Sequence, residues 1–313
     1  MSEYKAPLVS IVTPCFNGEN KIVPFFESVL AQTYENIELI FVNDGSEDKT
    51  EDICKEYEEK FNQRDIKFIY VFQCNRGQAA AINNGLKYVR GKYLTWPDSD
   101  DLLHPDYLEK KITFLENHPD LNMVISPIRH VTERGEALMV ERRKRQKEDN
   151  LFCDLINGMN CYYPPGGYLI TTEAFFQAYP EKTIIESPVG QNVQMLLPIA
   201  YMSRYGYIDD CLYDYVVYED SHAHRRRTFE QALNKSDMTS DLFLAVMKQM
   251  NLDHSDYNRY AKMVEHERYR RHFYYSIQYK KKEYMNESYK LYKQTGSVLP
   301  KIWLLHIVRR IKW

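Results

Sequence analysis

Short, unbroken apolar runs alternate with amphipathic stretches along the first hundred residues. The apolar runs predict four strands, at 8–13, 37–42, 66–71 and 93–96. Apolar residues at helical spacing predict three helices between them, at 21–32, 49–61 and 77–89. Strands that are apolar throughout are typical of a parallel sheet that helices cover on both faces. We therefore expect an α/β fold, in which ligands bind beyond the carboxyl ends of the strands.

The pattern changes in the second half of the chain. A fifth apolar run, "MVISPI" at 123–128, predicts another strand, and residues 191–202 predict a helix that strands within 207–218 follow. The C-terminal part is charged, rich in Tyr and poor in Gly and Pro, which predicts helices. The sequence thus indicates two domains, a first one over 1–225 and a helical C-terminal region over 226–313.

Composition narrows the class of protein. The chain has 313 residues, 44% of them hydrophobic, and a net charge of −3, which gives no electrostatic argument for nucleic-acid binding. No apolar run approaches the roughly 18 residues of a membrane-spanning helix, and the N-terminus lacks the apolar core of a signal peptide. Six cysteines without paired short spacing favour reduced thiols in the cytoplasm over a zinc site or disulfides. The basic run "ERRKRQKED" at 141–149 predicts a solvated loop or helix start rather than a binding patch.

A polar cluster follows each of the four strands. The first, "TPCFNGE" at 13–19, contains Pro14 and Gly18, which mark a turn. This turn leaves Asn17 and backbone groups free to meet a ligand, although an ordinary strand–helix loop explains the same residues.

The second and third clusters each contain one residue that local structure does not require. In "VNDGSEDKT", Ser46 or Asp48 can cap the next helix, but capping does not account for Asp44 at the strand tip. A carboxylate there can accept the N–H of a pyrimidine base. In "NRGQAAAINNGL", Arg76 beside the helix start at Gly77 and Gln78 forms an anion-attracting corner, or is simply a surface arginine.

The fourth cluster, "PDSDD", places Asp98, Asp100 and Asp101 within four positions. Two unit charges about 4 Å apart repel by about 4 kcal/mol at an effective dielectric constant near 20. An EF-hand loop is excluded because Leu102 and Leu103 stand where an oxygen ligand and a glycine are needed. Hard carboxylates at a strand end suit Mg²⁺ or Mn²⁺, which also binds phosphate oxygens, so we expect a divalent cation that carries a diphosphate.

Taken together in this order and spacing, the four clusters resemble the inverting glycosyltransferases of family 2, which have the GT-A fold. The resemblance covers roughly residues 7–220. It implies a mainly parallel sheet flanked by helices, with a helical C-terminal appendage. It also implies an enzyme that uses Mn²⁺ or Mg²⁺ to move a sugar from a nucleotide-sugar, most simply a UDP-sugar, to an acceptor hydroxyl with inversion.

The resemblance implies roles for individual residues. Those that match nucleotide-sugar contacts are Thr13, Pro14, Phe16, Asn17, Asp44, Arg76, Asp98 and Ser99. Asp98 and Asp100 match the Asp-x-Asp pair that holds the metal and the donor sugar, and Asp100 and the adjoining Asp101 are candidate catalytic residues. His222 and His224 match a segment that closes over the donor phosphates, where they could ligate metal; a solvated His/Arg run is the alternative.

The chain departs from the family pattern at the general base. Gln191 and Asn192 stand where the family usually carries a Glu-Asp pair at a helix start, and neither amide can take a proton at neutral pH. They remain candidates for contacts to the sugar or the acceptor, or form a polar helix cap. Glu186, five residues ahead of Gln191, is the first candidate for a replacement base, whereas Asp209 and Asp210 resemble a turn.

Two other functions remain open at this point. The amide pair suggests a non-catalytic subunit that binds nucleotide-sugars, and a diphosphate–metal site also suits a nucleotidyltransferase, although no glycine-rich phosphate loop with a catalytic Lys is seen in the sequence. As a transferase, the protein would take a glycan or lipid-linked glycan as acceptor in the assembly of a surface polysaccharide, glycolipid or glycoprotein. We expect it in the cytoplasm or at the inner face of the cell membrane.

The C-terminal segment 299–313 is amphipathic. Its apolar residues recur at helical spacing: Trp303, Leu304, Ile307, Val308 and Ile311. Cations flank them at Lys301, Arg309, Arg310 and Lys312. The helix either packs on the rest of the protein or anchors it peripherally to a membrane that carries a lipid-linked acceptor.

Overall fold

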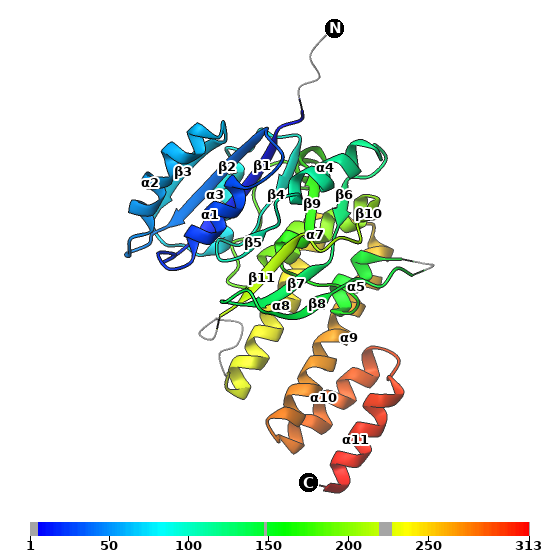
Figure 1. Ribbon diagram of the computed structural model, residues 1–313. Helices are drawn as coiled ribbons and strands as arrows, with labels where there is room; N and C mark the ends of the chain where they lie inside the picture. Colours follow the sequence, from blue (N-terminus) through cyan, green and yellow to red (C-terminus); the bar gives the residue numbers. More distant parts are fainter. Residues whose placement is uncertain (1–5, 147–148, 219–226, 313) are drawn as a thin grey trace. The chain divides into compact units, whose positions relative to one another are not determined.

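The chain divides into two compact units in the computed structural model, which describes residues 6–146, 149–218 and 227–312 (Figure 1). The first unit consists of residues 1–149 and 160–219, and the second of residues 150–159 and 220–313. The sequence placed 150–159 in the first domain, but this segment forms the helix α5 (Leu151–Asn157), which packs on a helix of the second unit.

A seven-stranded sheet forms the core of the first unit. Its strand order is β10-β6-β9-β4-β1-β2-β3. The strands are β1 (Val9–Cys15), β2 (Ile37–Asp44), β3 (Lys67–Gln73), β4 (Tyr93–Thr95), β6 (Met123–Ile125), β9 (Tyr168–Thr171) and β10 (Tyr205–Tyr207). Only β9, which lies between β4 and β6, runs antiparallel to its neighbours in this described part of the sheet. The predicted mainly parallel α/β fold is therefore confirmed.

A second, four-stranded sheet of the first unit was not predicted from the sequence. It contains β5 (Leu102–Leu103), β7 (Ile128–Thr132), β8 (Ala137–Glu141) and β11 (Tyr213–Val217), in the order β5-β11-β7-β8. The single strand predicted over 123–128 is wrong, because the chain leaves the first sheet after β6 and enters the second at β7. Pro127 lies at this break and has no N–H to donate to a strand neighbour.

Helices cover both faces of the first sheet. Those of the first unit are α1 (Ile22–Leu30), α2 (Thr50–Gln63), α3 (Gln78–Leu86), α4 (Tyr107–Glu116), α6 (Thr172–Ala178) and α7 (Gln191–Met202), with a short 3₁₀ helix, η1, over Pro165–Gly167. On one face, Phe26 of α1 packs edge-on against Phe41 of β2 and Phe61 of α2, with ring centroids 5.0 and 5.4 Å apart. Because side chains alternate along a strand, Ile40 and Val42 point to the other face, towards α3.

Gly85 explains why α3 can approach the sheet so closely. A Cβ atom at this position would lie 2.6 Å from Cγ1 of Val12 and 3.1 Å from Cγ2 of Val42. Any larger residue would push α3 away from β1 and β2 and displace its N-terminus, which lies at the carboxyl edge of the sheet. The glycine in the helix therefore helps to position the candidate site.

The basic run at 141–149 is only partly solvated, which corrects the prediction. The side chain of Arg143 is buried, and its guanidinium group bonds to Asp149 at 2.5 Å, to the Tyr207 hydroxyl at 2.8 Å and to the Asn160 carbonyl. A buried charge is tolerated when its hydrogen bonds are satisfied in this way. Arg143 thus ties this loop to β10 of the first unit.

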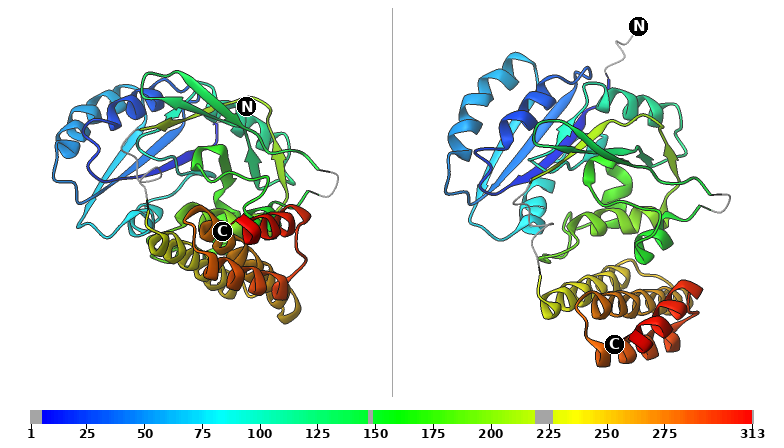
Figure 2. Two further views of the ribbon diagram at one scale, coloured as in Figure 1. Left: turned by 90° about the horizontal axis from the view of Figure 1, so that it is seen from below. Right: turned by 60° about the horizontal axis from the view of Figure 1, so that its bottom comes forward.

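The second unit is helical, as predicted. In addition to α5 it contains α8 (Phe229–Gln249), α9 (His254–Gln278), α10 (Lys282–Thr295) and α11 (Pro300–Lys312). Figures 1 and 2 show α9 beside α8 and α10, and these pairs form the main contacts of the unit. An apolar cluster of Phe273, Met285, Tyr292 and Ile302 joins α9, α10 and α11.

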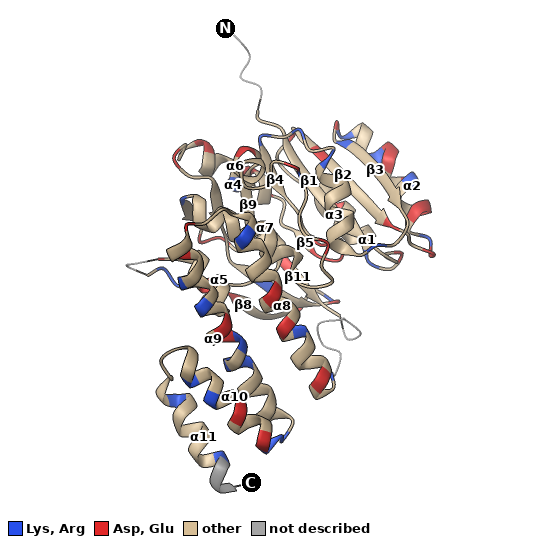
Figure 3. Ribbon diagram, turned by 180° about the vertical axis from the view of Figure 1, so that it is seen from behind, with Lys and Arg blue, Asp and Glu red and all other residues tan. Residues whose placement is uncertain are grey.

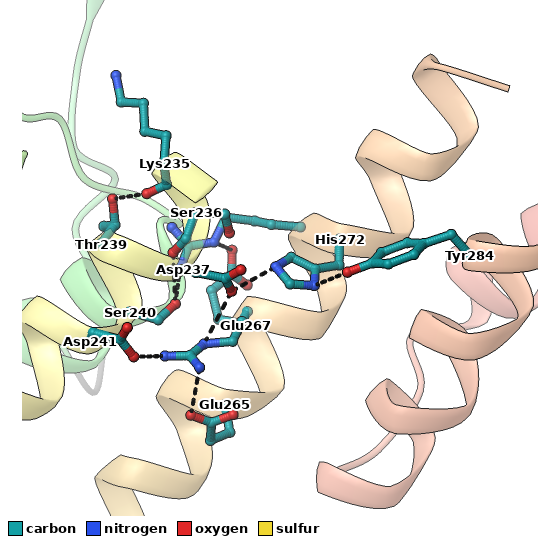
Figure 4. A network of polar contacts seen from close by, with 12 residues as sticks. Lys235, Ser236, Asp237, Thr239, Ser240, Asp241, Glu265, Glu267, His272 and Tyr284 are labelled. Atoms are coloured by element: carbon teal, nitrogen blue, oxygen red, sulfur yellow. Dashed lines mark hydrogen bonds and ion pairs between the residues drawn. The ribbon is translucent and has the colours of Figure 1, made fainter. Parts of the chain in front are cut away.

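A polar network joins α8 and α9 within the second unit (Figure 4). Arg268 of α9 bonds to Asp241 of α8, and Nε2 of His272 lies 2.9 Å from Asp237. The hydroxyl of Tyr284 on α10 lies 3.2 Å from the other ring nitrogen of His272. We read this network as structural, because it lies between packed helices and Arg268 pairs with both Asp237 and Asp241.

Within the described residues, no helix combines the length and apolar character that crossing a membrane requires.

Candidate functional site

The loops after β1 and β2 are bound to each other at the carboxyl edge of the sheet. The backbone N–H of Asn17 donates to the Ser46 hydroxyl at 2.9 Å, and Oδ1 of Asn17 accepts from the N–H of Glu47 at 3.0 Å. Asn17 adopts a positive φ of 51°, a conformation that Asn tolerates better than most residues. Its side chain therefore shapes the edge of the site, in addition to any ligand contact.

Asp44, at the tip of β2, holds the turn that precedes α3. Its Oδ1 accepts from the N–H of Arg76 at 2.9 Å and from Nε2 of Gln73 at 2.7 Å, while its Oδ2 accepts from the N–H of Gly77 at 2.8 Å. The residue is only 3% exposed. Asp44 therefore has at least partly a structural role, which the sequence left unexplained, because its carboxylate fixes the start of α3.

Arg76 faces a loop that lies far away in the sequence. Its Nη2 atom lies 2.7 and 3.0 Å from the two carboxylate oxygens of Glu186. Both side chains are largely exposed, so the pair contributes only about 0–1 kcal/mol to stability. A ligand anion can therefore compete for Arg76 at little energetic cost.

A chain of amides connects the aspartate cluster to α7. Nε2 of Gln78, at the start of α3, donates to Oδ1 of Asp98 at 2.8 Å. Its Oε1 accepts from Nε2 of Gln191 at 2.6 Å. Oδ1 of the neighbouring Asn192 accepts from Nε1 of Trp96, which directly follows β4, at 3.2 Å. The structure therefore brings both amides of α7 to the end of β4.

Asp100 has a positive neighbour. Nζ of Lys21, just ahead of α1, lies 3.8 Å from Oδ2 of Asp100 and 4.0 Å from the ring centroid of Tyr218. The Tyr218 hydroxyl in turn donates to the Asp100 carbonyl at 3.3 Å. Lys21 is the partner that offsets part of the repulsion within the cluster.

Asp101 points into the protein and connects the two sheets. Its Oδ2 accepts from the Tyr213 hydroxyl at 2.6 Å, and its Oδ1 accepts from the N–H of Val216 at 2.8 Å. The residue is only 1% exposed. Asp101 therefore positions β11 rather than facing a ligand, in contrast to the catalytic role expected for it.

Burial raises the pKa of all three carboxyl groups, and the charges of neighbouring aspartates raise those of Asp98 and Asp101 further. Burial, followed by the charge of Asp100, raises the pKa of Asp98 to about 7. Burial also raises the pKa of Asp100, although Lys21 opposes the shift, and raises that of Asp101 well above its usual range. Carboxylates in this state gain from a nearby cation.

Asp98 and Asp100 could hold a divalent cation only if other molecules, such as substrate phosphates, supplied its remaining ligands. Among the described residues, no group of three or more His, Cys, Asp or Glu side chains is arranged to hold a metal. Mg²⁺ is commonly held by one or two carboxylates together with substrate phosphates, and two partly exposed carboxylates whose pKa is raised chiefly by burial suit that mode.

The remaining predicted contacts differ in accessibility. Phe16 follows β1 and is 50% exposed, so its ring is free to pack on a ligand. Thr13 is fully buried within β1 and Pro14 is buried beside it, which places both side chains in the interior. Ser99 bonds to the buried thiol of Cys15. His222 and His224 lie outside the described residues.

Sequence reasoning missed Trp96 and Lys21 as site residues and named Gln78 only as part of a helix start. Gln78, Trp96 and Lys21 contact Asp98, Asn192 and Asp100, respectively, but none carries a distinctive sequence signal. Each lies at or next to the end of a predicted element: Lys21 begins the helix predicted over 21–32, Gln78 is the second residue of the one over 77–89, and Trp96 ends the strand over 93–96. Only their place at the carboxyl edge of the sheet could have drawn attention to them.

Comparisons with known proteins agree with this geometry. A family model described as glycosyl transferase family 2 matches residues 10–177, more than half of the chain. A 120-residue stretch is 40% identical to an uncharacterized glycosyltransferase of Rickettsia typhi and covers 38% of this chain and 36% of that protein. A 122-residue stretch is 38% identical to the minor teichoic acid biosynthesis protein GgaB of Bacillus subtilis and covers 38% of this chain and 13% of that protein. The matches thus span about a third or less of these relatives.

A solved structure extends the likeness to almost the whole chain. The crystal structure of residues 1–349 of Staphylococcus aureus TarS in complex with UDP-GlcNAc superposes with a TM-score of 0.64 at 15% identity. The superposition covers 92% of this chain and 89% of that one. At this identity the likeness is one of fold.

Asp98→Asn should change stability in a pH-dependent way when metal is removed with a chelator. Because folding raises the pKa of Asp98 from 3.8 to about 7, its ionisation costs stability as the pH rises through that interval. Relative to the wild type, the variant should gain on the order of 1 kcal/mol at pH 8 and much less at pH 4. Urea unfolding at both pH values measures this gain. An equal effect at both would contradict the raised pKa.

Asp101→Ala should destabilise the fold by about 2–3 kcal/mol, because it leaves the Tyr213 hydroxyl and the Val216 N–H buried without their acceptor. Tyr213→Phe removes only one of the two bonds and should cost about 1 kcal/mol. Urea denaturation of both variants tests the structural role. A fully stable Asp101→Ala variant would return Asp101 to the candidate catalytic residues.

Proposed function

Because the chain belongs to glycosyl transferase family 2 and has the GT-A fold that the sequence predicted, we propose that it transfers a sugar from a nucleotide-sugar to an acceptor hydroxyl with inversion. One observation carries the proposal. At the carboxyl edge of the sheet, the side chain of Gln78 is hydrogen-bonded to both Asp98 and Gln191. Gln78 thus connects Asp98, expected to contact the donor, with Gln191, a candidate for contacts to the sugar or the acceptor.

The donor would lie over the ends of β1, β2 and β4. Exposed Phe16 offers a ring to the nucleoside, and Asn17 shapes the adjoining loop. Arg76 and the N-terminus of α3 offer positive charge to the diphosphate, since the backbone N–H groups of a helix start attract anions. We propose a UDP-sugar as donor, in keeping with the polar strand tip at Asp44.

Asp98 and Asp100 would hold a divalent metal, Mn²⁺ or Mg²⁺. When bound, such an ion neutralises charge on the departing diphosphate. Lys21 keeps Asp100 partly compensated when no ligand is present.

The acceptor would lie beside α7. Gln191 donates to Gln78 and Asn192 accepts from Trp96, so both amides are held in place and can orient a hydroxyl group. Neither amide can take the proton of that hydroxyl. Glu186 is the carboxylate closest in sequence to this pair, and we propose that it accepts the proton once the donor diphosphate has drawn Arg76 away from it.

We propose a cell-surface polysaccharide as the acceptor class. The relative GgaB, which is 38% identical over 122 residues, carries a name from teichoic acid biosynthesis. The alternative of a non-catalytic nucleotide-sugar-binding subunit is favoured by the amide pair alone, and the activity measurements below decide between the two.

Asp98→Asn and Asp100→Asn should each lower the rate of sugar transfer by about 10²-fold or more, because the metal and the donor lose a charged ligand. A screen of UDP-, GDP- and dTDP-sugars by thermal unfolding with Mn²⁺ first identifies the donor. At a ligand concentration one hundred times Kd, stabilisation should be about 2.7 kcal/mol. Release of nucleoside diphosphate with acceptor then reports transfer.

Asp65→Asn is the matched control, since Asp65 is exposed and lies at the amino end of β3, on the opposite edge of the sheet. It should retain full activity. Transfer that survives both site substitutions, or that ignores a chelator, would refute the metal assignment. Donor binding without any release of diphosphate would favour the non-catalytic subunit.

Glu186→Gln and Asn192→Ala should lower turnover in different ways. A positioned base contributes about 10²–10⁴-fold, so Glu186→Gln should lose rate to that extent and also lose the acidic limb of the pH profile of kcat/KM. Asn192→Ala should keep that limb and lose rate by misplacing the acceptor. Glu181→Gln, an exposed change in the same loop, is the control. A wild-type rate in Glu186→Gln would exclude it as the base.

A further inference from the structure

One face of α11 is fixed by packing within the second unit. Ile302 is fully buried in the apolar cluster with Phe273 and Tyr292. Nearby, the ring of His306 stacks on Tyr289 with centroids 3.8 Å apart, and the two planes are inclined by only 9°. These contacts set the rotation of the helix about its own axis.

The face of α11 that points away from this packing is apolar and open to solvent. Leu299, Trp303 and Leu304 are 47%, 54% and 56% exposed, and we call these three residues the α11 outer face. Ile307 and Val308 continue the same stripe one turn later and are partly exposed. An exposed tryptophan beside exposed leucines is unusual for a surface that only meets water, and such patches mark interaction sites.

The surroundings of this face are strongly basic. The last 34 residues contain nine Lys and Arg and only two Asp and Glu, whereas the whole chain has a net charge of −3. On α10 and α11, Lys290, Lys293 and Lys301 are exposed, and they take part in none of the ion pairs between described residues. Figure 3 shows Lys and Arg on α10 and α11. The outer face therefore belongs to a part of the chain in which basic residues outnumber acidic ones.

We propose that the α11 outer face docks the protein on a lipid bilayer that carries anionic headgroups. Trp303, Leu299 and Leu304 would enter the boundary between headgroups and acyl chains, while the lysines of α10 and α11 meet lipid phosphates. The helix lies along the surface and does not cross it. Because a few apolar side chains and lysines give modest affinity, binding is reversible and weakens with salt.

A second copy of the chain fits this surface less well. A two-fold dimer would bring the same face of each copy together, and so would place the lysines of one copy against those of the other. Such like-charge pairing opposes association. An anionic bilayer offers the opposite sign of charge together with an apolar interior, which is the combination that the outer face requires.

The inference stands apart from the proposed glycosyltransferase activity, because it rests only on the second unit. If the protein transfers sugar to a soluble acceptor but does not bind membranes, only the membrane proposal fails. If it binds membranes but does not transfer sugar, only the proposed activity fails.

The test is flotation of the full chain with vesicles of phosphatidylcholine alone and with phosphatidylglycerol added. We expect binding to the mixed vesicles only, and a decrease of about tenfold or more in the bound-to-free ratio as NaCl rises from about 0.05 M to about 0.5 M. Trp303→Ser/Leu304→Ser should lower binding by about tenfold or more. Its melting temperature should stay near that of the wild type, because both side chains are already more than half exposed.

Matched controls test whether the effect belongs to this face. Leu138→Ser/Met139→Ser changes two side chains of the first unit that are 54% and 52% exposed, and should leave vesicle binding unchanged. Lys290→Gln/Lys293→Gln/Lys301→Gln should weaken binding and reduce its salt dependence. The same number of exposed lysines changed elsewhere, at Lys67, Lys87 and Lys248, should have little effect.

Three results would overturn the proposal. The first is equal binding to vesicles with and without phosphatidylglycerol, and the second is unchanged binding of Trp303→Ser/Leu304→Ser. The third is a concentration-dependent dimer, seen by sedimentation, that this double variant loses; it would assign the outer face to a second copy of the chain.

Discussion

Repulsion among the three carboxylates that follow β4 is the constraint on which the arrangement of the carboxyl edge depends. The chain relieves it by giving each carboxylate a different environment. Asp101 turns inward and accepts from Tyr213 and Val216, Asp98 accepts from Gln78, and Asp100 faces Lys21. Burial nevertheless keeps the pKa of all three carboxyl groups raised, so the protein by itself compensates their charges incompletely, and a bound cation would favour the ionised forms.

The same distribution separates structural from chemical roles. Both carboxylate oxygens of Asp101 accept hydrogen bonds from β11, so Asp101 holds the second sheet against the end of the first. This also places Tyr218, which follows β11, beside Asp100. Asp98 and Asp100 remain partly accessible and are left for a ligand. Asp44 shows the same division on β2, since its carboxylate fixes the start of α3 and so positions both Arg76 and Gln78.

The second unit is stabilised by different physics. Its helices join through the aromatic and aliphatic cluster around Phe273 and Ile302, and through the paired charges between α8 and α9. These contacts use one side of α11 and leave exposed apolar residues on the other side, in a part of the chain rich in lysine. Because α11 is apolar on two sides but packs on only one, its other apolar side remains exposed to solvent when the chain is alone.

The sequence by itself determined the alternation of strands and helices, the mainly parallel sheet and the acidic cluster at the end of β4, because hydrophobic period and turn residues are local properties. It also identified Gln191 and Asn192 as a departure from the family pattern. Only the tertiary structure showed that Asp101 is buried under Tyr213, that Glu186 pairs with Arg76 and that Gln78 connects Asp98 to Gln191. These contacts join residues 20 to 113 positions apart, and pairing at that distance depends on how the sheets and loops pack rather than on any local pattern.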